Sequence, residues 1–109
     1  LKTGVEHADG SLWASVVVTN GMSDWSVAPL PEAASDRALT FRASRKGDAV
    51  TVRYRIGDEP DWRLLRVAYL PPEARLDAGP MCCSPTREGL SVRFAPGRVG
   101  PPDASLHEE

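Results

Sequence analysis

Residues 39–56 read LTFRASRKGDAVTVRYRI and carry the clearest structural signal in the chain. On each side of residues 45–48, apolar residues alternate with threonine, serine and arginine. A period of two sends successive side chains of a strand to opposite faces. The stretch therefore predicts an antiparallel hairpin with one apolar face and one polar face that is exposed to solvent.

Two turn positions fit this hairpin, and they differ in which residues face each other. A loop centred on residues 47 and 48 would place Arg42 opposite Arg53. A loop centred on residues 46 and 47 would place Arg42 opposite Thr51 and Thr40 opposite Arg53. Like charges directly opposed are unfavourable, so the second register is preferred.

The rest of the chain repeats the strand pattern, with turns between short apolar runs and no sustained helical periodicity. Prolines at residues 29, 31, 71 and 72 interrupt it. Many short strands with close turns fit a sandwich or a barrel with an antiparallel sheet. Of these we predict an all-β fold, an antiparallel two-sheet sandwich, as domain 1–96, followed by a flexible C-terminal tail at 97–109. The further predicted strands are 1–7, 12–19, 24–28, 62–70, 76–84 and 90–95.

Composition excludes several classes of protein. Among 109 residues, 13 Lys and Arg stand against 15 Asp and Glu, so no basic field favours nucleic acid as a partner. The sequence indicates no membrane span and no signal peptide. Cys82 and Cys83 are adjacent, and on a predicted strand they would point to opposite faces as two free thiols. Free thiols favour a cytoplasmic location.

Four segments, in this order, resemble one known family. They are residues 15–27 (SVVVTNGMSDWSV), 45–50 (RKGDAV), 62–72 (WRLLRVAYLPP) and 79–85 (GPMCCSP). The chain is similar, over nearly all its length, to a concanavalin A-like family of unknown function from bacteria and fungi that includes the fungal "regulation of enolase" protein. The resemblance implies a jelly-roll sandwich and supplies no catalytic residues.

The resemblance also implies further strands ahead of the segment that resembles residues 1–7. Leu1 is not a methionine, and the strand pattern begins at once. We therefore expect a domain incomplete at its N-terminal side, a homodimer that completes the sandwich, or a partner chain that supplies strands to open sheet edges.

No pattern of catalytic residues emerges from the sequence. Glycosidases need two carboxylates on one face, and here the acidic residues fall mostly in turns, with Glu6 the exception. Metal ligation is not indicated, since the histidines are His7 and His107 and adjacent cysteines poorly suit one zinc site. Gly-x-Ser-x-Gly and phosphate-loop motifs are lacking. We expect no cofactor and no catalytic residues.

Two sets of residues are candidates for binding. Trp13 and Trp25 could stack on sugar rings, and Lys2 and Glu6, on one strand face, could line a ligand groove. The alternatives are that the tryptophans pack against the opposite sheet and that Lys2 and Glu6 form a cross-strand ion pair. By analogy with the concanavalin A-like fold that the resemblance implies, we expect a non-catalytic, lectin-like module that binds a carbohydrate or a small metabolite.

The second set is the arginine face, Arg42, Arg53 and Arg55 on the polar side of the hairpin, with Arg63 near its end. One interpretation is a solvated face that blunts sheet edges. The other is a patch for an anion or an acidic partner, which would make the domain a protein-interaction or regulatory module. The Trp62 ring is expected in the core or stapling a hairpin.

Overall fold

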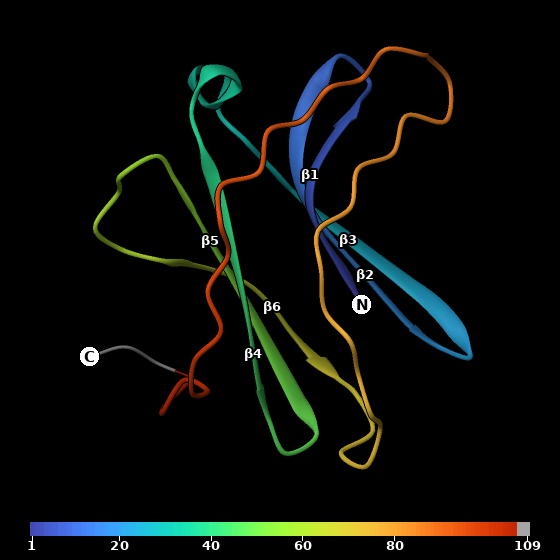
Figure 1. The fold of residues 1–109 in the computed structure, drawn as a ribbon, viewed down its shortest axis with the longest axis vertical. Coiled ribbons are helices and arrows are strands. Elements are labelled where there is room, and N and C mark those ends of the chain that lie inside the picture. Colours follow the sequence, from blue (N-terminus) through green and yellow to red (C-terminus); the bar gives the residue numbers. More distant parts are fainter. Residues whose placement is uncertain (107–109) are drawn as a thin grey trace.

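A computed structural model describes residues 1–106 and contains two three-stranded antiparallel sheets. The prediction of an all-β sandwich is confirmed. The first sheet has the order β1-β2-β3 and the second the order β4-β5-β6, each a simple meander (Figure 1). The strands are β1 (Lys2–Ala8), β2 (Ser11–Asn20), β3 (Met22–Pro29), β4 (Leu39–Lys46), β5 (Ala49–Ile56) and β6 (Arg63–Tyr69).

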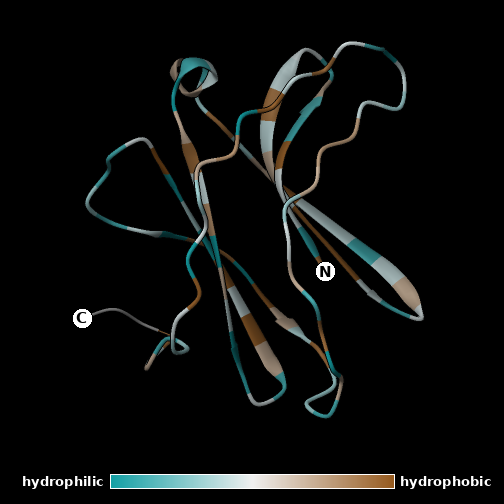
Figure 2. Ribbon diagram, in the orientation of Figure 1, coloured by the Kyte–Doolittle hydropathy of each residue, from teal (hydrophilic) through white to brown (hydrophobic). Residues whose placement is uncertain are grey.

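The two sheets pack face to face through the apolar positions of their middle strands. Val16 and Val18 of β2 meet Val50 and Val52 of β5 in one buried cluster. Hydrophobic and hydrophilic residues alternate along β5, whereas β2 carries three consecutive valines at residues 16–18 (Figure 2). The residues between these core positions therefore point away from the opposite sheet.

A short helical turn closes one end of the sandwich. This element, η1 (Glu32–Asp36), follows Pro31 and buries Ala34 against Leu30, Tyr54 and Ile56. It connects the two sheets, since it lies between β3 and β4. Within residues 1–106, no helix is long and apolar enough to cross a membrane.

The register preferred for the central hairpin is wrong. Lys46 pairs with Ala49, so the loop is residues 47 and 48, and Arg42 lies directly opposite Arg53. Gly47 has a φ of 61°. A two-residue hairpin loop whose first central residue has positive φ favours glycine at that position. The loop predicted from the sequence would have placed Lys46 there instead. Turn chemistry thus outweighed the repulsion between the arginines.

A bulge in β6 changes which residues face the core. The register shifts between Val52, which pairs with Arg66, and Arg53, which pairs with Leu64. Leu64 is exposed while Ala68 is buried, although simple alternation placed both on one face. A bulge inserts one residue and reverses the side-chain phase beyond it.

The predicted strands 76–84 and 90–95 are not formed. These residues run over the surface as irregular, exposed chain, drawn in orange in Figure 1. A strand needs a neighbouring edge for its N–H and C=O groups, and neither segment pairs with one among residues 1–106. Cys82 and Cys83 are consequently both exposed, not divided between two faces.

The predicted tail lies partly outside the described residues, which end at Leu106. Within residues 97–106 every residue is exposed except Asp103. The chain there returns to the second sheet (Figure 1), and Asp103 contacts β4 and β5. The boundary at residue 96 stays a prediction.

Candidate functional site

The arginine face is the outer surface of the β4–β5 hairpin. Because Val52 and Tyr54 point into the core, Arg53 and Arg55 between and after them point outward. Arg42 joins them from β4, opposite Arg53. The structure therefore brings the three predicted arginines together on one face.

Asp103 binds two of these arginines at once. Its Oδ2 accepts a hydrogen bond from Nη1 of Arg53 at 2.6 Å, and its Oδ1 pairs with Arg42. The Arg53 side chain is only 3% exposed. A buried guanidinium needs a charged or polar partner, and the shared carboxylate also offsets the repulsion between the two arginines. This explains why the register with opposed arginines is tolerated.

Main-chain groups of residues 103–106 form further hydrogen bonds with β4 and β5. The amide N–H of Asp103 donates to Oγ of Ser44 at 2.7 Å. Nη2 of Arg53 donates to the carbonyl of Leu106, and Nζ of Lys46 to that of Ala104 at 3.3 Å. The site therefore binds both a carboxylate and the backbone that follows it.

Trp62 supports the guanidinium groups from the side. Arg42 and Arg55 lie over its ring, with their Cζ atoms 5.1 and 4.6 Å from the ring centroid. Such stacking orients arginines and is worth about 0.5–1 kcal/mol at exposed sites. Nε of Arg55 is buried and has no hydrogen-bond partner. Trp62 is half-buried and stacks on Arg42 and Arg55 on the outer face of the sheet, rather than filling the core.

Trp13, Trp25, Lys2 and Glu6 share the outer face of the first sheet. Register places Glu6 beside Trp13, and both Lys2 and Trp25 beside Val17. Nε1 of Trp25 donates to Oε2 of Glu6 at 3.2 Å, and its side chain is 58% exposed. Nε1 of Trp13 donates to the carbonyl of Ala8 at 3.0 Å.

These positions correct the packing alternative for the two tryptophans. Both lie on the face turned away from β4–β6, since Ala14, Val16 and Val18 supply the inward face. Glu6 uses its carboxylate on Trp25, not on Lys2. The outer face therefore presents an exposed indole ring fixed by a neighbouring carboxylate.

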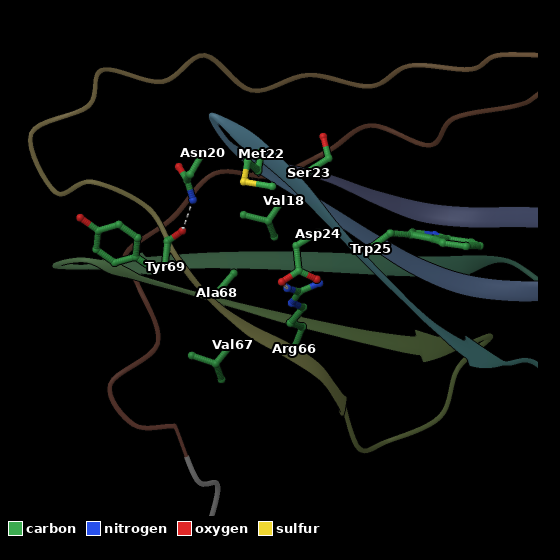
Figure 3. Close-up of a pocket in the computed structure, with 10 residues that line it drawn as sticks. All are labelled: Val18, Asn20, Met22, Ser23, Asp24, Trp25, Arg66, Val67, Ala68 and Tyr69. Atoms are coloured by element: carbon green, nitrogen blue, oxygen red, sulfur yellow. Dashed lines mark hydrogen bonds and ion pairs between the residues drawn. The ribbon is translucent and has the colours of Figure 1, made fainter.

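An open cleft of about 680 Å³ lies between the end of the β2–β3 hairpin and β6 (Figure 3). Asp24 and Arg66 form an ion pair across it at 3.0 Å, and Asn20 donates to the carbonyl of Tyr69 at 2.9 Å. The Trp25 ring points away from the ion pair. The polar groups named here join the two sheets.

Arg63, the first residue of β6, does not extend the arginine face, because it binds Glu59 in the loop before that strand. Its Nη2 donates to Oε1 of Glu59 at 2.7 Å. This side-chain bond, followed by a bond from the amide of Ile56, lowers the pKa of Glu59 below its ordinary value. The pair closes the loop between β5 and β6.

Comparison with known proteins places the chain in a family. A family profile matches residues 1–102. The chain belongs to the family described as Protein of unknown function (DUF1349). It is 36% identical over 109 residues to "Regulation of enolase protein 1" of Saccharomyces cerevisiae. The alignment covers 99% of this chain and 54% of that relative, so the chain spans about half the relative's length.

No solved structure matches this member of the family. Membership of this family, which the resemblance predicted, is confirmed, and the four segments that carry the resemblance fall inside the matched residues. The family description assigns no activity to any residue. The sites described above therefore rest on the geometry of this chain.

Sequence reasoning missed four contributors to the arginine site: Ser44, Lys46, Asp103 and Trp62 in its stacking role. Asp103 follows two prolines in a segment that reads as solvated tail, and nothing local marks it as a ligand. Ser44 shares the polar face with Arg42 by alternation, which is the one signal that could have found it.

Proposed function

We propose that this domain is a non-catalytic interaction module that binds an acidic segment of a partner protein on its arginine face. The observation that carries the proposal is the carboxylate of Asp103, held between Arg42 and Arg53. Arginine forks suit carboxylates in both shape and charge. The face accommodates one carboxylate in this chain, so the same chemistry suits a partner's carboxylate.

The relative supports a regulatory role through its name. "Regulation of enolase protein 1" is named for regulation, and a module without catalytic groups regulates by binding. Because the chain spans about half of that relative, an enolase is a candidate partner to test and not an assigned one.

The test is a titration of the purified chain with a fluorescent peptide rich in aspartate, followed by anisotropy. Arg42→Glu is expected to weaken binding at least about tenfold, since reversal replaces attraction by repulsion. Arg42 is suited to this change because its side chain is 37% exposed. Rising salt should weaken binding to the unmodified chain.

The matched control is Arg87→Glu, which makes the same charge change on an exposed residue away from this face. If both variants weaken binding equally, only net charge matters and the proposal fails. A purified enolase, added in place of the peptide, tests the relative's name under the same two substitutions.

A second candidate function, carbohydrate binding, is favoured by the exposed Trp25 ring and its bond to Glu6. An aromatic ring beside a carboxylate can stack on a sugar and accept from its hydroxyls. A neutral oligosaccharide that raises the unfolding midpoint should lose this effect in Trp25→Ala and keep it in Trp25→Phe. A panel of neutral sugars without any shift would reject this candidate.

A further inference from the structure

Residues 103–106 lie on the arginine face as a bound peptide would. The carboxylate of Asp103 forms ion pairs with Arg42 and Arg53, and its backbone N–H donates to Oγ of Ser44. Carbonyls of Ala104 and Leu106 then accept from Lys46 and Arg53. Each contact joins the segment to β4 or β5, at least 50 residues earlier in the chain.

The receptor side of this contact is more deeply buried than the peptide side. Arg53 is 3% exposed and Ser44 is 8% exposed. From residue 75 to residue 106, every residue except Asp103 is exposed. A segment held by polar contacts on the outer face of a sheet, with exposed chain before it, can leave without opening the core.

We infer that residues 103–106 are an internal copy of the ligand. On this inference, which rests on the proposed function, the site takes a short peptide segment. The ligand's aspartate enters between Arg42 and Arg53, and its following carbonyls are bound by Lys46 and Arg53. The chain's own segment fills the site until a partner segment with the same features displaces it.

The tether makes the internal ligand a strong competitor. A ligand joined to its receptor acts at an effective concentration of the order of millimolar. An added peptide can bind only the fraction of molecules in which the segment has left the site. Its apparent Kd therefore equals its intrinsic Kd divided by that fraction. Removing the Asp103 carboxylate should therefore tighten binding of an outside peptide at least about tenfold.

The experiment uses the full chain and a labelled peptide with the sequence of residues 100–106, acetylated and amidated so that aspartate is its one charged group. Anisotropy titrations compare the unmodified chain with Asp103→Ala. The expected result is at least about tenfold tighter binding to Asp103→Ala. Adding Arg53→Met to that variant, or replacing the peptide's aspartate by asparagine, should abolish the gain.

A second readout needs no substitution, in case Asp103→Ala fails to fold. In NMR spectra of the unmodified chain, amide signals of residues 103–106 should move toward free-segment positions as unlabelled peptide is added. Signals that stay in place while the peptide binds would show that it binds elsewhere, which overturns the inference.

The outcomes separate this inference from the proposed function. Equal affinity of both chains for the peptide, with loss in Arg42→Glu, overturns internal occupancy and leaves the proposed function standing. No binding by folded Asp103→Ala overturns both. Competition by inorganic phosphate as strong as that by unlabelled peptide overturns recognition of the main chain, because phosphate offers only charge.

Discussion

At the scale of single residues, one carboxylate that is distant in the sequence offsets the repulsion between two paired arginines of the arginine face. Arg42 and Arg53 lie opposite each other in the sheet, which pairwise rules disfavour. Asp103 turns the repulsive pair into a three-member cluster. A cross-strand rule applied to two residues therefore fails when a third residue joins them.

The Glu59–Arg63 pair gives a pH prediction at the same scale. Since the folded-state pKa of Glu59 is lowered, its contribution to stability is present above its unfolded-state pKa. That contribution is lost as pH falls from about 4.5 through the lowered value. Arg63→Leu should raise the pKa of Glu59 toward 4.5, measured by NMR titration of the side-chain carboxyl carbon.

The control for that titration is Arg66→Leu, which removes a different arginine of β6 that pairs with Asp24. It should leave the Glu59 titration unchanged. An equal rise of the Glu59 pKa in both variants would mean that general charge, and not the hydrogen bond from Arg63, lowers it.

At the scale of the elements, tight turns decide the register of the strands. Gly47 and Gly57 both have positive φ, 61° and 58°, at opposite ends of β5. Around Gly47 there is open space for a Cβ, whereas at Gly57 a Cβ would overlap the guanidinium of Arg37. The same positive-φ conformation thus occurs with and without a steric neighbour.

This difference predicts unequal effects of alanine at the two turns. Gly47→Ala should lower the free energy of unfolding by about 1–2 kcal/mol, the cost of a left-handed residue with a Cβ. Gly57→Ala should cost more, by less than ~1 kcal/mol, because Arg37 must also leave its exposed pair with Asp58. Urea denaturation of both variants measures the difference.

Substitution of Arg37 by alanine isolates the steric part. In an Arg37→Ala background, Gly57→Ala and Gly47→Ala should cost the same. If the excess cost at Gly57 persists, it comes from the turn itself and the overlap with Arg37 has no effect on stability.

At the scale of the whole molecule, apolar surface remains uncovered beyond β6. Large exposed apolar residues are spread along the irregular segment: Leu76, Met81, Leu90, Val92, Phe94 and Val99. Each sheet also has two edge strands, β1 and β3 in one and β4 and β6 in the other. Exposed apolar groups and open edges favour association.

The chain is therefore expected to self-associate. Its sedimentation coefficient should rise with concentration across the micromolar range. The triple variant Leu90→Lys, Val92→Lys, Phe94→Lys should remain monomeric, because it removes apolar contacts and adds repulsion. A control with Ser84→Lys, Thr86→Lys and Ser91→Lys adds the same charge at exposed polar positions.

If the control variant stays as monomeric as the first, charge alone prevents association and the apolar residues are not responsible. An unmodified chain that sediments as a monomer at every concentration contradicts the prediction outright. That result would also leave a homodimer without support as the way to cover this surface.

The sequence pattern was enough to predict the six strands between residues 2 and 69, the all-β class and the common face of Arg42, Arg53 and Arg55. Alternation is a local property, and it assigns each side chain to a face whatever the sheets later pack against. It also predicted strands at 76–84 and 90–95, where the structure has none, because a strand depends on a neighbour that local pattern does not supply.

Tertiary packing set the β6 bulge and the pairing of the arginines with Asp103. The hairpin register instead follows from the glycine at the first turn position, which is a local signal that the charge argument overlooked. Asp103 is 61 residues from Arg42 and 50 from Arg53 along the chain. Contacts over such separations arise from how the whole chain packs, and no local periodicity encodes them. The arginine face was therefore visible in the sequence, and the carboxylate that occupies it was not.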